Sequence, residues 1–172
     1  MSKIVNYELI TSTSNIQADM YGSRAKCLQR LIRLGLPVPQ SVALSVPFVN
    51  SIALGKSIDL KKLVTCFPAS PIISVRSSPV SAEWGGPSTI LNIGMNSEIE
   101  KVYSNTLGSF AARELHTKFI KSFAIEVMRL DDEIFDHINI TPEVAIDAYE
   151  QEIAECFPRT IEAQLSEVLK SM

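Results

Sequence analysis

The residues best suited to chemistry in this chain of 172 residues lie in one stretch, at positions 72–94. An apolar, β-branched run carries Arg76 at its end, a loop of small residues with Gly85 and Gly86 follows, and a second apolar run begins at Thr89. A guanidinium offers a fork of donors, and glycine lets backbone N–H groups approach a ligand closely, so this pattern suits a polyphosphate. The same residues also fit a plain β-hairpin whose loop needs glycine and whose arginine lies on a solvated edge.

The other polar residues show no pattern typical of a catalytic or metal site. His116 and His137 lack the neighbouring cysteines and carboxylates of a metal site, and we expect both on the surface. The acidic run at positions 131–133 fits a helix terminus, where carboxylates favour the positive end of the dipole. Gly55 and the two residues after it look like the end of a P-loop, but that motif needs a glycine where this chain has Asn50.

The spacing of apolar residues along the chain predicts an α+β fold in one domain, residues 1–172, which holds these residues. Residues 1–96 read as a mixed part with a small mixed sheet. Within it, strands are predicted at 4–9, 41–45, 72–76 and 89–94. Short helices are predicted at 46–54 and 60–67, and a longer one from an N-cap at Ser23 to Leu34, ended by Gly35. The apolar stripe expected on that longer helix consists of Leu28, Leu31, Ile32 and Leu34.

Residues 97–172 are predicted to be helical. Apolar residues recur at helical spacing from position 107 to 128 and indicate one long amphipathic helix with a buried phenylalanine stripe. Two shorter helices follow, one beginning near Pro142, which suits a first helical turn, and one after Pro158. The residues that mark the long helix are Leu107, Phe110, Ala111, Leu115, Phe119, Ile120, Phe123, Val127 and Met128.

Composition excludes several classes of function. Hydrophobic residues make up 46% of the chain and charged residues 20%, which indicates a folded protein without a membrane span. The net charge of −3 argues against nucleic-acid binding, which needs a concentrated basic face. Three scattered cysteines without a Cys-x-x-Cys pair favour a reduced, cytoplasmic protein over a disulfide scaffold or a zinc site.

Two motifs resemble the N-terminal region of the pyruvate phosphate dikinase and phosphoenolpyruvate synthase family. Positions 75–77 (Val-Arg-Ser) and 89–94 (Thr-Ile-Leu-Asn-Ile-Gly) match the family's Val-Arg-Ser and Leu-Asn-Leu-Gly loop, with the same spacing. Upstream, positions 22–28 and 33–39 are similar to its glycine-rich loop and its Leu-Gly-Leu-Pro-Val-Pro signature. Looser similarity extends over the rest of the chain. The resemblance implies the first lobe of an ATP-grasp module, which binds ATP with Mg²⁺.

The resemblance implies a nucleotide site formed by Arg24, Arg76, Gly85, Gly86 and Thr89. Arg24 falls on the family's loop lysine and keeps its charge, although a planar fork replaces a compact ammonium. Other positions depart from the family pattern. Serine and alanine replace two glycines around Arg24, and the second loop carries an additional glutamate at position 83 and a serine in place of the usual aspartate at position 88.

Two classes of function remain open. In the family, a second lobe supplies the carboxylates for magnesium and a separate domain carries the phosphorylated histidine, and the similarity stops before both. The chain is therefore expected to be an incomplete phosphotransferase component that needs a second protein, or a non-catalytic interaction or regulatory module. In either case an apolar surface that carries Trp84 and the side of Met95 is the candidate site for a partner or for self-association, and the alternative is that Trp84 packs onto its own domain.

Overall fold

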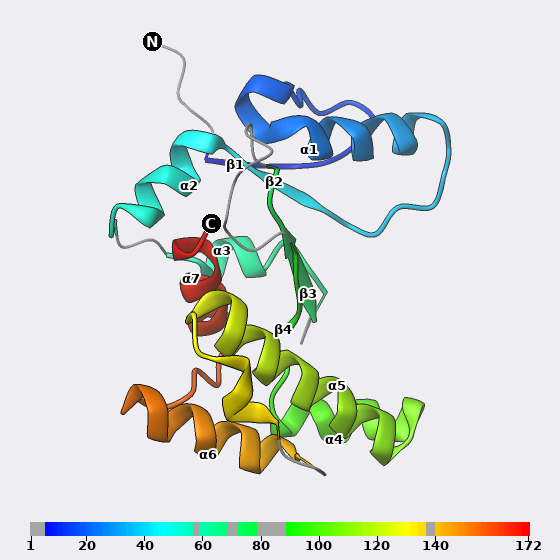
Figure 1. The fold of residues 1–172 in the computed structure, drawn as a ribbon. Coiled ribbons are helices and arrows are strands. Elements are labelled where there is room, and N and C mark those ends of the chain that lie inside the picture. The colour runs from blue at the N-terminus through cyan, green and yellow to red at the C-terminus, as the bar shows by residue number, and fades with distance from the viewer. Residues whose placement is uncertain (1–5, 57–58, 69–71, 79–88, 137–139) are drawn as a thin grey trace.

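The structure, a computed structural model, describes residues 6–56, 59–68, 72–78, 89–136 and 140–172, and their fold is α+β, as expected (Figure 1). In Figure 1, helix α1 and strands β1 and β2 lie at one end, strands β3 and β4 lie in the middle, and helices α4, α5 and α6 lie at the other end. The elements are β1 (Tyr7–Leu9), α1 (Ala18–Arg33), β2 (Val42–Leu44), α2 (Val46–Ala53), α3 (Lys61–Val64), β3 (Ile73–Arg76), β4 (Thr89–Ile93), α4 (Ser97–Leu107), α5 (Ser109–Ser122), a π-helix (Phe123–Val127), a 3-10 helix (Asp132–Phe135), α6 (Pro142–Ile153) and α7 (Ile161–Lys170).

The described strands form two separate antiparallel sheets in place of one small mixed sheet. In the first, β1 pairs with β2, with Tyr7 opposite Leu44. Helix α1 packs on this sheet around a small cluster of four buried residues: Ile10, Ile16, Ala25 and Ala43. Gln29 of α1 is fully buried and donates to the carbonyl oxygens of Thr11 and Ser14, which fixes the loop between β1 and α1.

Helix α1 begins earlier than its sequence predicts. It starts at Ala18 rather than after Ser23, and it is broken at Gly22, whose φ of 83° and ψ of 158° are not helical. Only glycine adopts such angles at little cost, because a Cβ would clash with the backbone. Ser23 directly follows this break instead of capping the start of the helix.

The end of α1 agrees with the prediction. Gly35 adopts a φ of 74°, its N–H donates to the carbonyl of Ile32, and the N–H of Leu36 donates to Leu31. These two hydrogen bonds close the C-terminus of the helix in a Schellman motif. The prediction that Leu34 belongs to the buried stripe is wrong, because this residue lies at the turn and is 74% exposed.

A second positive-φ glycine explains the fragment that looks like a P-loop. Gly55 has a φ of 84°, and its N–H donates to the carbonyl of Ile52, while that of Lys56 donates to Ser51. Gly55 therefore ends helix α2, and Lys56 belongs to this helix terminus.

The hairpin predicted around the arginine is confirmed by the pairing of β3 with β4. Ile73 lies opposite Ile93 and Arg76 opposite Thr89, and β4 carries one residue more than β3 between these pairs. This bulge includes Asn92, which has a φ of 60°. Helices α5 and α7 pack against β4, so one face of the hairpin joins the core. The residues that point to the other face, such as Arg76, remain exposed.

The prediction of a single long helix at positions 107–128 is wrong. Leu107 is the last residue of α4, and Gly108, with φ 85° and ψ 150°, separates α4 from α5. After Ser122 the helix widens into one π turn. Phe110 is 82% exposed and does not belong to the buried stripe. The helices predicted from Pro142 and after Pro158 are present as α6 and α7.

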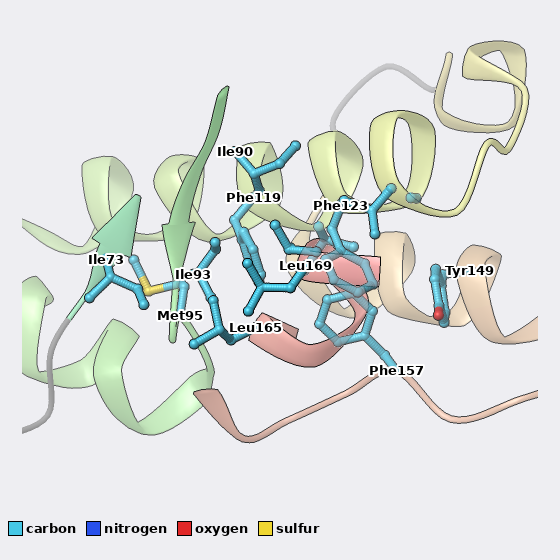
Figure 2. Close-up of a cluster of buried hydrophobic side chains, with 14 of the residues drawn as sticks. Ile73, Ile90, Ile93, Met95, Phe119, Phe123, Tyr149, Phe157, Leu165 and Leu169 are labelled. Carbon is cyan, nitrogen blue, oxygen red and sulfur yellow. The ribbon is translucent and has the colours of Figure 1, made fainter. Parts of the chain in front are cut away.

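The main core draws on both halves of the chain and includes an aromatic cluster (Figure 2). The ring of Phe157 lies 6.1 Å from that of Phe119, 5.4 Å from that of Phe123 and 5.1 Å from that of Tyr149, and all three pairs are close to edge-to-face. Such pairs stabilise by about 0.5–1.5 kcal/mol beyond their buried area. Met95 is completely buried beside this core, so the prediction that it lies on an exposed interaction surface is wrong.

Gln164 of α7 connects this helix to the end of β4. Its side-chain oxygen accepts the N–H of Gly94 at 2.7 Å, and its amide nitrogen donates to the carbonyls of Met95 at 3.1 Å and Pro158 at 2.9 Å. The side chain is fully buried. Its hydrogen bonds therefore satisfy three backbone groups in the interior.

Candidate functional site

The β3–β4 hairpin places two of the predicted nucleotide-binding residues side by side. Arg76 is the last residue of β3 and Thr89 the first residue of β4, and the two are directly paired. Side chains of directly paired residues project to the same face of a sheet. Arg76 is exposed and Thr89 is half-buried, so the guanidinium and the hydroxyl share a face that is open to a ligand.

The third predicted residue, Arg24, approaches the same hairpin from helix α1. The backbone N–H of Arg24 donates to the hydroxyl of Ser78 at 3.3 Å, and the hydroxyl of Ser23 lies 3.4 Å from that of Ser78. Ser78 follows β3 two residues after Arg76. Two consecutive peptide units span about 7 Å at most, so the backbone of Arg24 lies near the end of the strand that carries Arg76.

The approach of α1 to Ser78 depends on the glycine at the break in the helix. A Cβ placed on Gly22 would lie 2.6 Å from the Cβ of Ser78 and 2.7 Å from its hydroxyl oxygen. Real Cβ atoms do not come so close to other atoms, so the missing side chain is what allows the contact. The glycine-rich motif at positions 22–28 therefore contacts the residue that directly follows the Val-Arg-Ser motif, although 54 positions separate Arg24 from Ser78.

Two exposed arginines contribute positive charge to this region. Arg24 and Arg76 are both exposed, and within the described part of the chain no carboxylate forms an ion pair with either. Their charges are therefore available to a ligand. Guanidinium groups bind phosphate in a bidentate manner, which suits this pair to a polyphosphate chain.

The remaining predicted residues, Gly85 and Gly86, lie outside the described residues, as do Trp84 and His137. Among the residues that the structure does describe, no group of three or more histidine, cysteine or acidic side chains is arranged to hold a metal ion. Sequence reasoning missed Ser78 as part of this region. The available signal was its position next to the Val-Arg-Ser motif, but nothing in the sequence indicates which segment it contacts.

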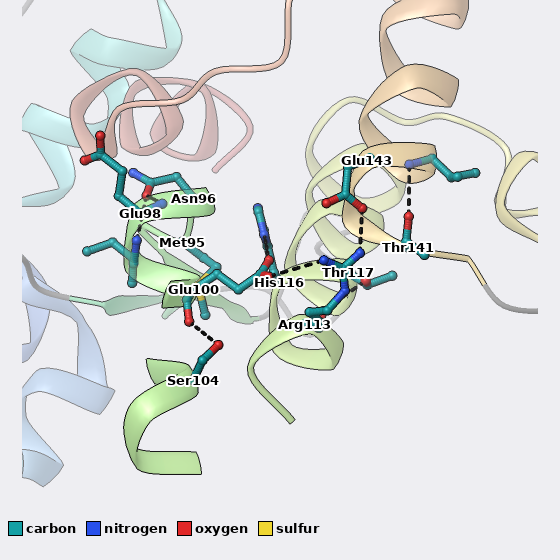
Figure 3. A network of polar contacts seen from close by, with 12 residues as sticks. Met95, Asn96, Glu98, Glu100, Ser104, Arg113, His116, Thr117, Thr141 and Glu143 are labelled. Carbon is teal, nitrogen blue, oxygen red and sulfur yellow. Dashed lines mark hydrogen bonds and ion pairs between the residues drawn. The ribbon is translucent and has the colours of Figure 1, made fainter. Parts of the chain in front are cut away.

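A second polar cluster joins helices α4, α5 and α6 (Figure 3). The Nδ1 atom of His116 lies 2.6 Å from a carboxylate oxygen of Glu100, and the other carboxylate oxygen lies 3.6 Å from the guanidinium of Arg113. Arg113 also donates to Glu143 of α6 at 2.7 Å. His116 is 3% exposed, so the expectation that it lies on the surface is wrong.

The helix termini around this cluster are capped by side chains. Asn96 caps α4 by accepting the N–H groups of Glu98 and Ile99, and Thr141 caps α6 by accepting the N–H of Val144. The pKa of the Glu143 carboxyl lies below its ordinary value. The carboxyl accepts hydrogen bonds from its own backbone N–H and from the hydroxyl of Thr141, and Arg113 contributes less. This cluster connects helices α4, α5 and α6.

The acidic run at positions 131–133 also marks a helix terminus, as predicted. The side chain of Asp131 accepts the N–H of Glu133 and caps the 3-10 helix (Asp132–Phe135). Its carboxylate is thereby engaged with the backbone.

Comparison with models of known protein families finds no match, and no curated protein is significantly similar in sequence to this chain. In the described part of the chain, no helix has both the length and the apolar character needed to span a bilayer. The described candidate site therefore consists of the exposed Arg24 and Arg76 together with Ser78 and Thr89.

Proposed function

We propose that this chain is the ATP-binding portion of a phosphotransferase similar to pyruvate phosphate dikinase and phosphoenolpyruvate synthase. The observation that carries the proposal is the contact of Arg24 with Ser78, because it unites the two motifs of the family resemblance at the open face of Arg76 and Thr89. A polyphosphate bound there would receive charged hydrogen bonds from two arginines. Gly85 and Gly86 belong to the same proposed site.

In this proposal, ATP binds together with Mg²⁺, and the carboxylates for the metal come from a second lobe or subunit. Phosphoryl transfer depends on positioning and on the neutralisation of charge by metal ions. The chain therefore binds nucleotide weakly and transfers no phosphoryl group by itself. The three free cysteines support a reduced environment, and we assign the protein to the cytoplasm.

Calorimetric titration of the chain with Mg-ATP tests the proposal. We expect weak binding by the wild-type chain and a loss of about tenfold or more in Arg76→Ala, since one charged hydrogen bond contributes about 1.5–3 kcal/mol. Arg24→Ala should weaken binding in the same direction. Arg30→Ala is the matched control, because Arg30 is an exposed arginine on the same helix, and it should bind like the wild type.

Absence of heat at millimolar Mg-ATP would contradict nucleotide binding. Equal affinity of the Arg76→Ala and wild-type chains would contradict the assigned site. Incubation with labelled ATP, Mg²⁺ and pyruvate provides the catalytic test, and we expect no labelled product from the chain alone.

The exposed apolar residues of α4 and α5 favour a second candidate, a non-catalytic interaction module. No residue of α4 is fully buried, Val102 is 60% exposed, and Phe110 at the start of α5 is 82% exposed. Exposed apolar surface of this kind is typical of interaction sites. Sedimentation of the wild type and of Phe110→Ser distinguishes this candidate, because self-association through α4 and α5 should weaken in the variant.

A further inference from the structure

Ser78 makes an unusually close contact for a residue outside any helix or strand. Its hydroxyl accepts the N–H of Arg24 at 3.3 Å and lies 3.4 Å from the hydroxyl of Ser23. Its Cβ and hydroxyl occupy the space in which a side chain of Gly22 would lie, 2.6 and 2.7 Å from the ideal Cβ position. Three consecutive residues of α1 thus face one serine at the end of β3.

Among the described glycines at a helix end or a helix break, Gly22 makes this contact and the others do not. Gly35, Gly55 and Gly108 also have positive φ angles, of 74°, 84° and 85°, but a Cβ on any of them would meet no atom within 4 Å. These three positions need glycine for the backbone angle alone. Gly22 needs it for its φ of 83° and for the close approach of Ser78.

The position of Arg24 relative to Arg76 follows from this contact. Arg24 donates its own N–H to Ser78, and Arg76 is two residues away from Ser78 along the chain. Both side chains are exposed. Ser78 therefore links the backbone of Arg24 to the strand that carries Arg76, and a change that moves α1 away from Ser78 breaks this link.

We infer that Ser78 is a positioning residue, which holds the Gly22–Arg24 turn of α1 against the end of β3 so that Arg24 and Arg76 contact one polyphosphate chain. This inference rests on the proposed nucleotide-binding function and adds to it a residue that contacts no substrate. It requires that tight packing at Gly22 affects ligand affinity, and not only the stability of the fold.

The test compares Gly22→Ala with Gly108→Ala, measured by calorimetry with inorganic tripolyphosphate and with Mg-ATP on the folded chain. Both variants place alanine at nearly the same backbone angles, φ 83° and ψ 158° at Gly22 and φ 85° and ψ 150° at Gly108, so they carry similar backbone strain. Only Gly22→Ala collides with Ser78. We expect tripolyphosphate to bind Gly108→Ala like the wild type and Gly22→Ala about tenfold more weakly, the loss typical of one broken charged contact.

A compensating variant isolates the contact itself. In Gly22→Ala/Ser78→Gly, the new methyl group occupies the space vacated by the serine side chain, so affinity should recover in part relative to Gly22→Ala, up to that of Ser78→Ala, which lacks the same hydroxyl. If Gly22→Ala does not fold, Ser78→Ala replaces it, because this variant removes only the hydroxyl and should weaken tripolyphosphate binding about threefold, as expected from one neutral hydrogen bond.

The outcomes separate this inference from the proposed function. If the variants bind both ligands like the wild type, or if the double variant shows no recovery, Ser78 has no positioning role while nucleotide binding stands. If the variants show the expected pattern with tripolyphosphate but the wild type does not bind Mg-ATP, the positioning role stands and the nucleotide function fails. If the wild type binds neither ligand, both are wrong.

Discussion

Replacement of Gln164 by leucine should destabilise the fold strongly, because this side chain is buried and satisfies three backbone groups. Leucine has a similar volume, so the change leaves little cavity. It removes the acceptor for the Gly94 N–H and the donor to the carbonyls of Met95 and Pro158. At about 0.5–1.5 kcal/mol for each net hydrogen bond, the expected loss in the free energy of unfolding is about 3 kcal/mol.

Equilibrium unfolding in urea measures this loss. The midpoint should fall while the m-value stays unchanged, since the same surface is exposed on unfolding. For a chain of this length, a loss of 3 kcal/mol also corresponds to a decrease in Tm of about 6–12 °C.

Gln151→Leu provides the matched control for this prediction. Gln151 is exposed on helix α6, and the same substitution there should change stability by no more than about 0.5 kcal/mol. A loss below about 1 kcal/mol in Gln164→Leu would refute the reasoning, because it would mean that the three backbone groups find other partners at little cost.

Three further measurements test the packing and the polar clusters. Phe123→Ala should cost about 3–5 kcal/mol in urea unfolding, whereas Phe110→Ala, at a position that is 82% exposed, should change stability by less than about 0.5 kcal/mol; similar effects would contradict the assigned core. Burial, and then nearby glutamates, raise the pKa of Tyr149 to about 12 from the ordinary value of 10.0. The free energy of unfolding should therefore fall by up to about 2 kcal/mol as the pH rises from 10 to 12, because the unfolded chain releases the phenolic proton first. Tyr149→Phe, unfolded in parallel, should lack this loss. His116→Leu leaves the partly buried carboxylate of Glu100 without its 2.6 Å partner and should cost about 1–3 kcal/mol in the same assay, and no loss would show that Arg113 alone satisfies this carboxylate.

Local signals in the sequence were sufficient for most of the elements. Apolar, β-branched runs predicted β3 and β4, the glycine at position 35 predicted the end of α1, and Pro142 predicted the start of α6. In each case the physical cause lies within a few residues of the element, as a backbone angle, a cap or a spacing. The Arg76–Thr89 pair could be expected for the same reason, since a hairpin brings the ends of its strands together.

Predictions failed where tertiary contacts decide the structure. The apolar repeat continues across Gly108, whose positive φ ends α4 so that α4 packs against α5. His116 is buried beside Glu100 from another helix, and Met95 is buried in the main core, which includes residues of α5 and α7. The contact of Gly22 with Ser78 joins segments 56 positions apart, so neither residue reveals it locally.

The small cluster around α1 has a consequence for the proposed nucleotide site. Among the residues that the structure describes, four make up its buried part, compared with twenty in the main core, so α1 has fewer fully buried apolar partners there. Segments with few buried contacts open at lower free energy than the rest of a fold. A ligand that binds both Arg24 and Arg76 bridges α1 and the β3–β4 hairpin, and it stabilises the closed arrangement by mass action. Tripolyphosphate should therefore slow amide exchange in α1 more than in α5, and equal slowing in both helices would argue against a bridging ligand.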